Sequence, residues 1–141
     1  MPGESAVDAA IAHALALGPE SSIRDHTVDI TTIGARSGEP RRIEIWFHTV
    51  DGQVYLTGLP GPRAWYANLL AHPELTFHLT NEVRADLPAT ATPITDPAER
   101  ARLFAAIIAG IDELYARRGS PRRVAHAQDW VLRSPLVRVD F

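Results

Sequence analysis

The sequence predicts an α+β protein whose core is a small antiparallel barrel with helices at its periphery. Two observations support this prediction. Segments of alternating hydrophobicity between residues 27 and 94 are joined by short turns, and the longer helical patterns lie outside most of that run. The chain has 141 residues, which suits one domain over 1–141. Within it, residues 1–20 supply an N-terminal helix and residues 95–132 a helical region.

The first half of the chain gives the clearest signals. A loose apolar stripe over residues 5–17 predicts a helix, which ends at Gly18 and Pro19. Residues 27–33 are rich in β-branched side chains and predict a strand. Residues 41–49 alternate and predict a second strand. One face of that strand carries Ile43, Ile45 and Phe47, and the other carries Arg42, Glu44, Trp46 and His48.

The remaining elements follow a hairpin signal at Asp51 and Gly52. The glycines and prolines of residues 58–62 form a loop that leads into a short helix. In chain order we expect a strand over 53–57, a helix over 63–71, a strand over 74–80, a strand over 85–94 that Pro88 makes bent or edge-like, a helix over 95–109 that Gly110 interrupts, further helix over 111–117, a helix over 124–132 and a strand over 136–141.

Composition narrows the classes of function. The chain has no cysteine, which excludes disulfides and thiolate metal sites, and we expect a cytoplasmic protein. It has no lysine, so an anion site must use arginine, histidine or backbone N–H groups. The net charge of -3 does not favour nucleic acid, no apolar run is long enough to span a membrane, and the six histidines lack metal-site spacing.

Residues 34–42 form the first candidate site. Ser37 and Gly38 stand in a turn that can expose backbone N–H groups, and Arg36 and Arg41 flank it with guanidinium groups suited to phosphate. A solvated basic turn explains the same residues equally well. The spacing alone does not separate the two interpretations.

A second candidate is the segment over residues 58–68. Gly58 allows a flat ring to approach the backbone closely, and a loop that leads into a helix can direct N–H groups at a ligand. Trp65 shares a helical face with Leu69, so core packing explains it in part. Asn68 follows one turn later and can cap or bond locally.

Trp46 is unusual on the polar face of its strand. An aromatic side chain there suits the wall of a partly open pocket, or a subunit interface. His48 lies on the same face and could approach His78 of another strand. Three side chains are candidate proton donors, without a basis for choosing among them: His48, Tyr66 and Tyr115.

Four motifs in order resemble the deazaflavin-dependent nitroreductase family, also called F420H2-dependent quinone reductases. They are TIGARSGEPR over residues 32–41, IWF over 45–47, WYANL over 65–69 and HP over 72–73. The resemblance implies a split β-barrel that binds F420 and transfers a hydride to a small electron-poor acceptor of quinone or nitro type. FMN is the alternative cofactor, and a non-catalytic carrier of F420 or of an apolar ligand is the alternative function.

The resemblance also implies the cofactor site. Arg36 and Arg41 match the residues that hold the phosphate tail, with Ser37 and Gly38 between them. The residues that match the ring-binding positions and the helix motif are Ile45, Trp46, Thr57, Gly58, Leu59, Trp65 and Asn68.

Three departures from the family pattern bear on activity. Ala35 stands where an arginine is usual, the loop over residues 59–62 is shortened, and residues 122–130 lack the tyrosines of the nitroimidazole-reducing members, so that Tyr115 is the nearest. These departures weaken the expectation that the protein reduces nitroimidazoles, and they leave the expectation of cofactor binding in place. The free strand edges of a small barrel also make a homodimer reasonable.

Overall fold

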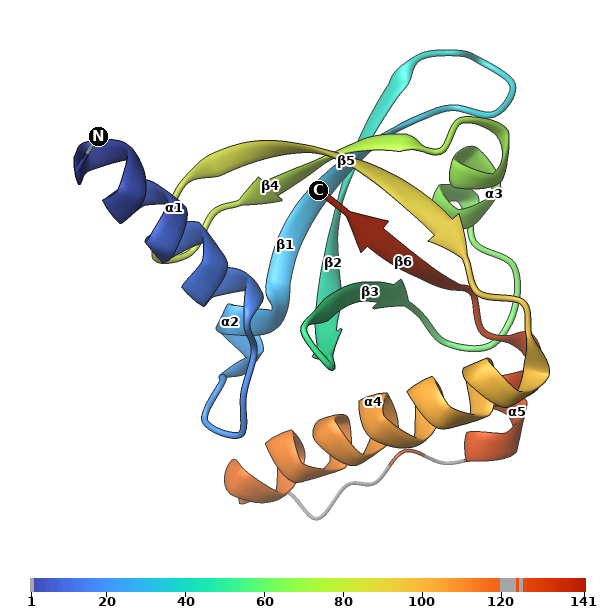
Figure 1. The fold of residues 1–141 in the computed structure, drawn as a ribbon. Coiled ribbons are helices and arrows are strands. Elements are labelled where there is room, and N and C mark those ends of the chain that lie inside the picture. The colour runs from blue at the N-terminus through green and yellow to red at the C-terminus, as the bar shows by residue number, and fades with distance from the viewer. Residues whose placement is uncertain (1, 120–123, 125) are drawn as a thin grey trace.

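The computed structural model describes residues 2–119, 124 and 126–141, with side chains from residue 8 onward. Within these residues, six antiparallel strands close a barrel in the order β1-β2-β3-β6-β5-β4, and five helices lie at its periphery (Figure 1). The predicted α+β barrel is therefore confirmed. The strands are β1 (Thr27–Ile33), β2 (Pro40–Val50), β3 (Gln53–Thr57), β4 (Glu74–Leu79), β5 (Ala85–Pro93) and β6 (Leu136–Asp140), and the helices are α1 (Pro2–Leu15), α2 (Ile23–His26), α3 (Ala64–Ala71), α4 (Pro97–Arg117) and α5 (Ala127–Arg133).

Alternating side chains from all six strands fill the barrel. Phe47 of β2 and Phe77 of β4 meet edge to face at its centre, with ring centroids 5.3 Å apart. Both rings are fully buried, as the predicted alternation of β2 requires. The other buried side chains of this core include Val28, Ile30, Val54, Leu56, Leu75, Leu79, Ala89, Ala91, Val137 and Val139.

The barrel is split beside the first half of β2. Residues 40–46 of this strand pair with β1 alone, and only residues 47–50 pair with β3. The other edge of residues 40–46 therefore has no strand partner in the described part of the chain. Every second residue of this edge can offer its N–H and C=O groups to a ligand.

A second core lies between the outer wall of the barrel and α4 (Figure 1). Asp96 caps α4, since its side chain accepts a hydrogen bond from the Glu99 N–H at 2.9 Å, and Pro97 opens the helix as predicted. The predicted break at Gly110 is wrong. The glycine lies on the exposed side of the helix, and the apolar stripe continues past it to Ile111 and Leu114, so packing offsets the cost of glycine.

Other differences from the predicted elements are small. The short helix α2 was not predicted, although Ser22 and Asp25 form a capping box that the sequence contains. At Pro88, β5 pairs with β4 alone, because its pairing with β6 begins at Thr90, so the strand has a local edge there. The predicted helix over 124–132 is found as α5 over 127–133. Residue 125 of the predicted range lies outside the described residues.

Candidate functional site

The turn between β1 and β2 is held by its own hydrogen bonds. The Gly34 N–H donates to the Glu39 carbonyl oxygen at 2.8 Å, and the Gly38 N–H donates to the Gly34 carbonyl oxygen at 2.9 Å. Ser37 Oγ accepts the Glu39 N–H at 3.2 Å. A Cβ atom at Gly34 would collide with Ser37 Oγ, and Gly38 has φ +70°, so both glycines are needed for this shape.

Two backbone donors of the turn are left over. Within the described part of the chain, the N–H groups of Arg36 and Ser37 make no hydrogen bond to protein. The side chain of Arg36 is exposed, and that of Arg41 is 57% exposed. The ion pair of Arg41 with the exposed Glu39 carboxylate is long, at 3.9 Å. The turn therefore presents two N–H groups flanked by two available guanidinium groups, a donor set suited to a phosphate.

Asn68 of α3 ties this turn to the second sequence motif. Its Oδ1 accepts the Ala35 N–H at 2.9 Å, and its Nδ2 donates to Thr32 Oγ1 at 3.0 Å. Asn68 and Thr32 are both buried. The two motifs of the resemblance thus form one hydrogen-bonded unit. Direct contact between Asn68 and the cofactor stays a prediction.

We expect Asn68→Ala to lower the free energy of unfolding by about 2 kcal/mol, because it leaves the buried Thr32 hydroxyl and the Ala35 N–H without partners. Affinity for a ligand of the turn should fall as well. Denaturant unfolding measures the first effect. Asn81→Ala is the control, since the Asn81 amide makes a single bond to Asp25, and an equal loss in both variants would contradict the role of Asn68.

The predicted ring-lining residues lie along the split. Ile45 packs against the barrel core, and Trp46 lies on the outer face, as the alternation predicts. The Trp46 ring is partly buried and lies 6.0 Å from the His26 ring and 6.5 Å from the Tyr115 ring, measured between centroids. Trp46 thus stands in a wall between the strand and α4, close to the unpaired edge of β2.

The segment after β3 lies beside the start of β6. The Thr57 hydroxyl donates to the Pro135 carbonyl oxygen at 2.6 Å, so its proton already has a protein partner. A Cβ at Gly58 would meet only ordinary contacts with Arg63 and Pro135, while Leu59 is 63% exposed. Exposed apolar surface at Leu59 is available to a flat ligand.

Trp65 and the candidate proton donors have different surroundings. Trp65 is buried in the barrel core, as the packing interpretation predicts. Tyr66 packs partly against the same core, whereas Tyr115 of α4 lies beside Trp46. Among the aromatic pairs of the described residues, Tyr115 is the tyrosine whose ring lies next to that of Trp46.

His48 does not meet His78. The His48 ring lies 5.5 Å from that of His26, whose Nδ1–H donates to the Phe47 carbonyl oxygen at 2.9 Å. His78 is held elsewhere, between Thr31 Oγ1 at 2.7 Å and Asp86 Oδ1 at 2.6 Å. Burial lowers the pKa of His48 to about 3, with a smaller effect from His26, so His48 is neutral near pH 7.

This burial predicts acid sensitivity. A neutral histidine with a depressed folded pKa stabilises the fold above its unfolded pKa of 6.5, and that stability is lost as pH falls below 6.5. From His48 alone, the free energy of unfolding should drop by about 2 kcal/mol between about pH 7 and pH 5, since each pH unit costs about 1.4 kcal/mol. Burial also lowers the pKa of His26, which adds in the same direction.

Urea unfolding at several pH values measures this dependence. His48→Gln removes one titrating group, so its curve should be flatter over the same interval. A variant whose stability falls as steeply as that of the wild type would contradict the assignment to His48.

Comparison with known proteins identifies the family. A family model described as F420H(2)-dependent quinone reductase matches residues 17–123. The chain belongs to this family. It is therefore an F420-dependent reductase with F420 as its cofactor, and the resemblance of the motifs is confirmed. Among curated protein sequences, none matches the chain significantly.

Solved structures agree on the fold. A conserved hypothetical protein, Rv2991 from Mycobacterium tuberculosis, is 18% identical with a TM-score of 0.58, and the match covers 92% of this chain and 77% of that one. An F420-H2 dependent reductase, FDR-A, is 21% identical with a TM-score of 0.53, covering 82% and 94%. A chain described as a domain-swapped dimer is 17% identical with a TM-score of 0.53, covering 99% and 100%. Identities this low support the split barrel and nothing finer.

Two further observations concern the described residues only. No helix in that part of the chain combines the length and apolar character needed to cross a bilayer. No group of three or more histidine or acidic side chains there could hold a metal ion.

Proposed function

We propose that the turn over residues 34–41 holds the phosphate of F420 and that its ring lies along the split beside β2. The observation that carries this proposal is the pair of unbonded N–H groups at Arg36 and Ser37, held in place by Asn68. Arg36 and Arg41 add charge to the same spot. Backbone and guanidinium donors fixed before binding lose little entropy when a phosphate arrives.

The ring would lie against Ile45 and Trp46 on one side and the segment from Thr57 to Leu59 on the other. The unpaired edge of β2 supports this placement, because it offers backbone groups to the polar edge of a ring. Trp65 and Asn68 would support the site from behind rather than touch the cofactor.

We further propose that the acceptor is a small, flat, electron-poor compound of quinone or nitro type. Bound F420 supplies the hydride when reduced, and the acceptor gains a proton as well. The protein would align acceptor and ring and exclude water. Burial lowers the pKa of His48 to about 3, so near pH 7 it holds no imidazolium proton to donate. Tyr115 lies beside Trp46 and is the side chain we favour as proton donor, with solvent as the other source.

The test mixes purified protein with reduced F420 and a panel of quinones and nitro compounds, and follows the absorbance of oxidised F420. We expect turnover with at least one quinone. F420 that binds without turnover on any acceptor would favour the carrier instead. A parallel titration with FMN, read by quenching of tryptophan fluorescence, should give weaker binding than F420.

Two broader expectations belong to the same proposal. A cytoplasmic location rests on the cysteine-free composition. A homodimer is the second expectation, because small barrels leave free strand edges, and the mass of the protein in solution tests it. A partner strand and the cofactor ring would compete for the unpaired edge of β2.

A further inference from the structure

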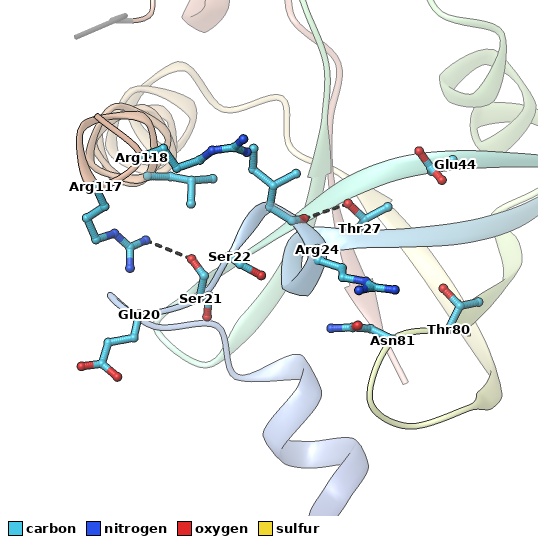
Figure 2. A pocket seen from close by; sticks show the side chains of 12 residues that line it. Glu20, Ser21, Ser22, Arg24, Thr27, Glu44, Thr80, Asn81, Arg117 and Arg118 are labelled. Atoms are coloured by element: carbon cyan, nitrogen blue, oxygen red, sulfur yellow. Dashed lines mark hydrogen bonds between the residues drawn. The ribbon is translucent and has the colours of Figure 1, made fainter. Parts of the chain in front are cut away.

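A cavity of about 760 Å³ opens on the outer side of the hairpin formed by β1 and β2 (Figure 2). The short helix α2 forms one wall, and the C-terminal end of α4 forms another. Thr27 and Glu44 of the two strands also line it. The residues singled out by the sequence motifs do not include its basic side chains.

Three arginines line this cavity. Arg24 comes from α2, and Arg117 and Arg118 come from the end of α4. Among the described residues, none of the three has a carboxylate within 4.0 Å. Arg117 donates to the Ser21 carbonyl oxygen at 3.0 Å, while the guanidinium groups of Arg24 and Arg118 make no hydrogen bond in the described part of the chain.

The cavity also has carboxylates on its rim. Glu20 extends away from the arginines in Figure 2, and Glu44 lies at the far end on β2. A cation near the C-terminus of a helix is stabilised by the helix dipole, which accounts for arginines at the ends of α2 and α4. Both side chains are exposed, and in Figure 2 Arg24 extends toward Asn81 while Arg118 lies on the side of α4. The helix dipole does not explain why two guanidinium groups without a protein partner line the same cavity.

The cavity adjoins the proposed ring site. Thr27 is the register partner of Trp46, and Glu44 precedes Trp46 by two residues on the same face of β2. Leu114 lines the cavity and directly precedes Tyr115, whose ring contacts that of Trp46. The cavity therefore lies next to the outer side of the Trp46 wall, while the rings of Trp46 and Tyr115 do not themselves line it.

We infer that this cavity takes the acidic group of the electron acceptor, so that the preferred acceptors are flat electron-poor rings carrying a carboxylate or sulfonate. This inference rests on the proposed function, because it assumes that an acceptor is reduced beside Trp46. Charge-assisted bonds from arginine to an anion are the strong hydrogen bonds of such sites.

The test compares 1,4-naphthoquinone with its 2-sulfonate as acceptors. Because their intrinsic reactivities differ, the informative quantity is the ratio of their kcat/KM values in each protein. In the double variant Arg24→Gln, Arg118→Gln the ratio of sulfonate to parent quinone should fall more than tenfold. Arg117 is left in place, because its guanidinium already donates to the Ser21 carbonyl oxygen.

Arg102→Gln is the matched control. It removes one positive charge, as the Arg118→Gln half of the double variant does, about 24 Å along the helix from Arg118. Among the described residues, the Arg102 side chain pairs with Asp51 alone. This variant should keep the wild-type ratio. A ratio that is unchanged in the double variant, or that falls equally in Arg102→Gln, would overturn the inference while leaving the proposed function intact.

A binding measurement separates the two proposals. Naphthalene-2-sulfonate does not accept a hydride, so calorimetric titration of the cofactor-free protein measures binding without turnover. The part of the binding that depends on Arg24 and Arg118 reports on the cavity, since the turn over residues 34–41 is unchanged in the double variant. We expect binding that the double variant loses. If neither quinone is reduced by the wild type, the proposed function fails, and the same titration still decides the cavity: no binding, or equal binding in the double variant, overturns it.

Discussion

Replacing Arg100 with methionine should lower the free energy of unfolding by about 3 kcal/mol. The guanidinium donates to four backbone carbonyl oxygens, those of Ile94, Val131 and Ser134 at 2.6–2.9 Å and that of Trp130 at 3.4 Å. It joins the start of α4 to α5 and to the turn before β6. Methionine keeps much of the apolar stem but leaves these carbonyl groups without their donor.

The Arg100 variant is informative because burying a charged guanidinium is unfavourable unless its hydrogen bonds offset the cost. Burial lowers the pKa of Arg100, so desolvation opposes the charge and the carbonyl oxygens must offset it. The guanidinium carbon also lies 5.3 Å from the centre of the Phe104 ring. Arg102→Met, at an exposed position two residues further along α4, should change stability by less than about 0.5 kcal/mol. Thermal and urea unfolding of both variants measure the difference, and equal stabilities would show that these carbonyl bonds contribute little.

The double variant Arg36→Ala, Arg41→Ala should lower the affinity for F420 by well over tenfold. Each charge-assisted bond to a phosphate contributes about 1.5–3 kcal/mol, and exposure of both side chains places the sum toward the lower end of the expected range. The fold should be unaffected, because Arg36 has no ion pair or side-chain hydrogen bond within the described part of the chain and the ion pair of Arg41 with Glu39 is long and exposed. Tryptophan fluorescence quenching on titration with F420 measures the affinity.

Arg42→Ala is the control for that experiment. It removes an arginine one residue further along β2, where the side chain lies on the outer face and its Nε donates to Asp29 at 2.9 Å. This variant should bind F420 nearly as well as the wild type. If Arg42→Ala lowered the affinity for F420 as much as the double variant does, the loss would reflect a general effect of charge rather than direct phosphate binding by Arg36 and Arg41.

The periodic parts of the fold were predictable from sequence. Alternation along residues 41–49 placed Phe47 inside the barrel and Trp46 outside it, because one buried face fixes the orientation of a strand. The sequence predicts an interruption at Gly110 that the helix over 97–117 does not have. Local propensity carries no information about the packing that holds α4 together.

The site was predictable in its motifs but not in its connections. The turn and the Trp65 to Leu69 helix stand out in the sequence, yet the bonds of Asn68 to Ala35 and Thr32 link residues more than 30 positions apart. The role of Arg100 and the cavity near Arg24 depend likewise on distant partners. Local patterns contain no information about which segments meet in space, so these features required the structure.

The most direct test of the phosphate clamp compares F420 with a deazaflavin that lacks the phosphate tail. In the wild type, F420 should bind more than tenfold more tightly than the tail-free compound, because only F420 reaches Arg36, Arg41 and the free N–H groups of the turn. In the Arg36→Ala, Arg41→Ala variant most of that advantage should disappear, while affinity for the tail-free compound stays near its wild-type value. Equal affinities of the wild type for the two compounds, or an advantage that survives the double substitution, would contradict the placement of the phosphate at this turn.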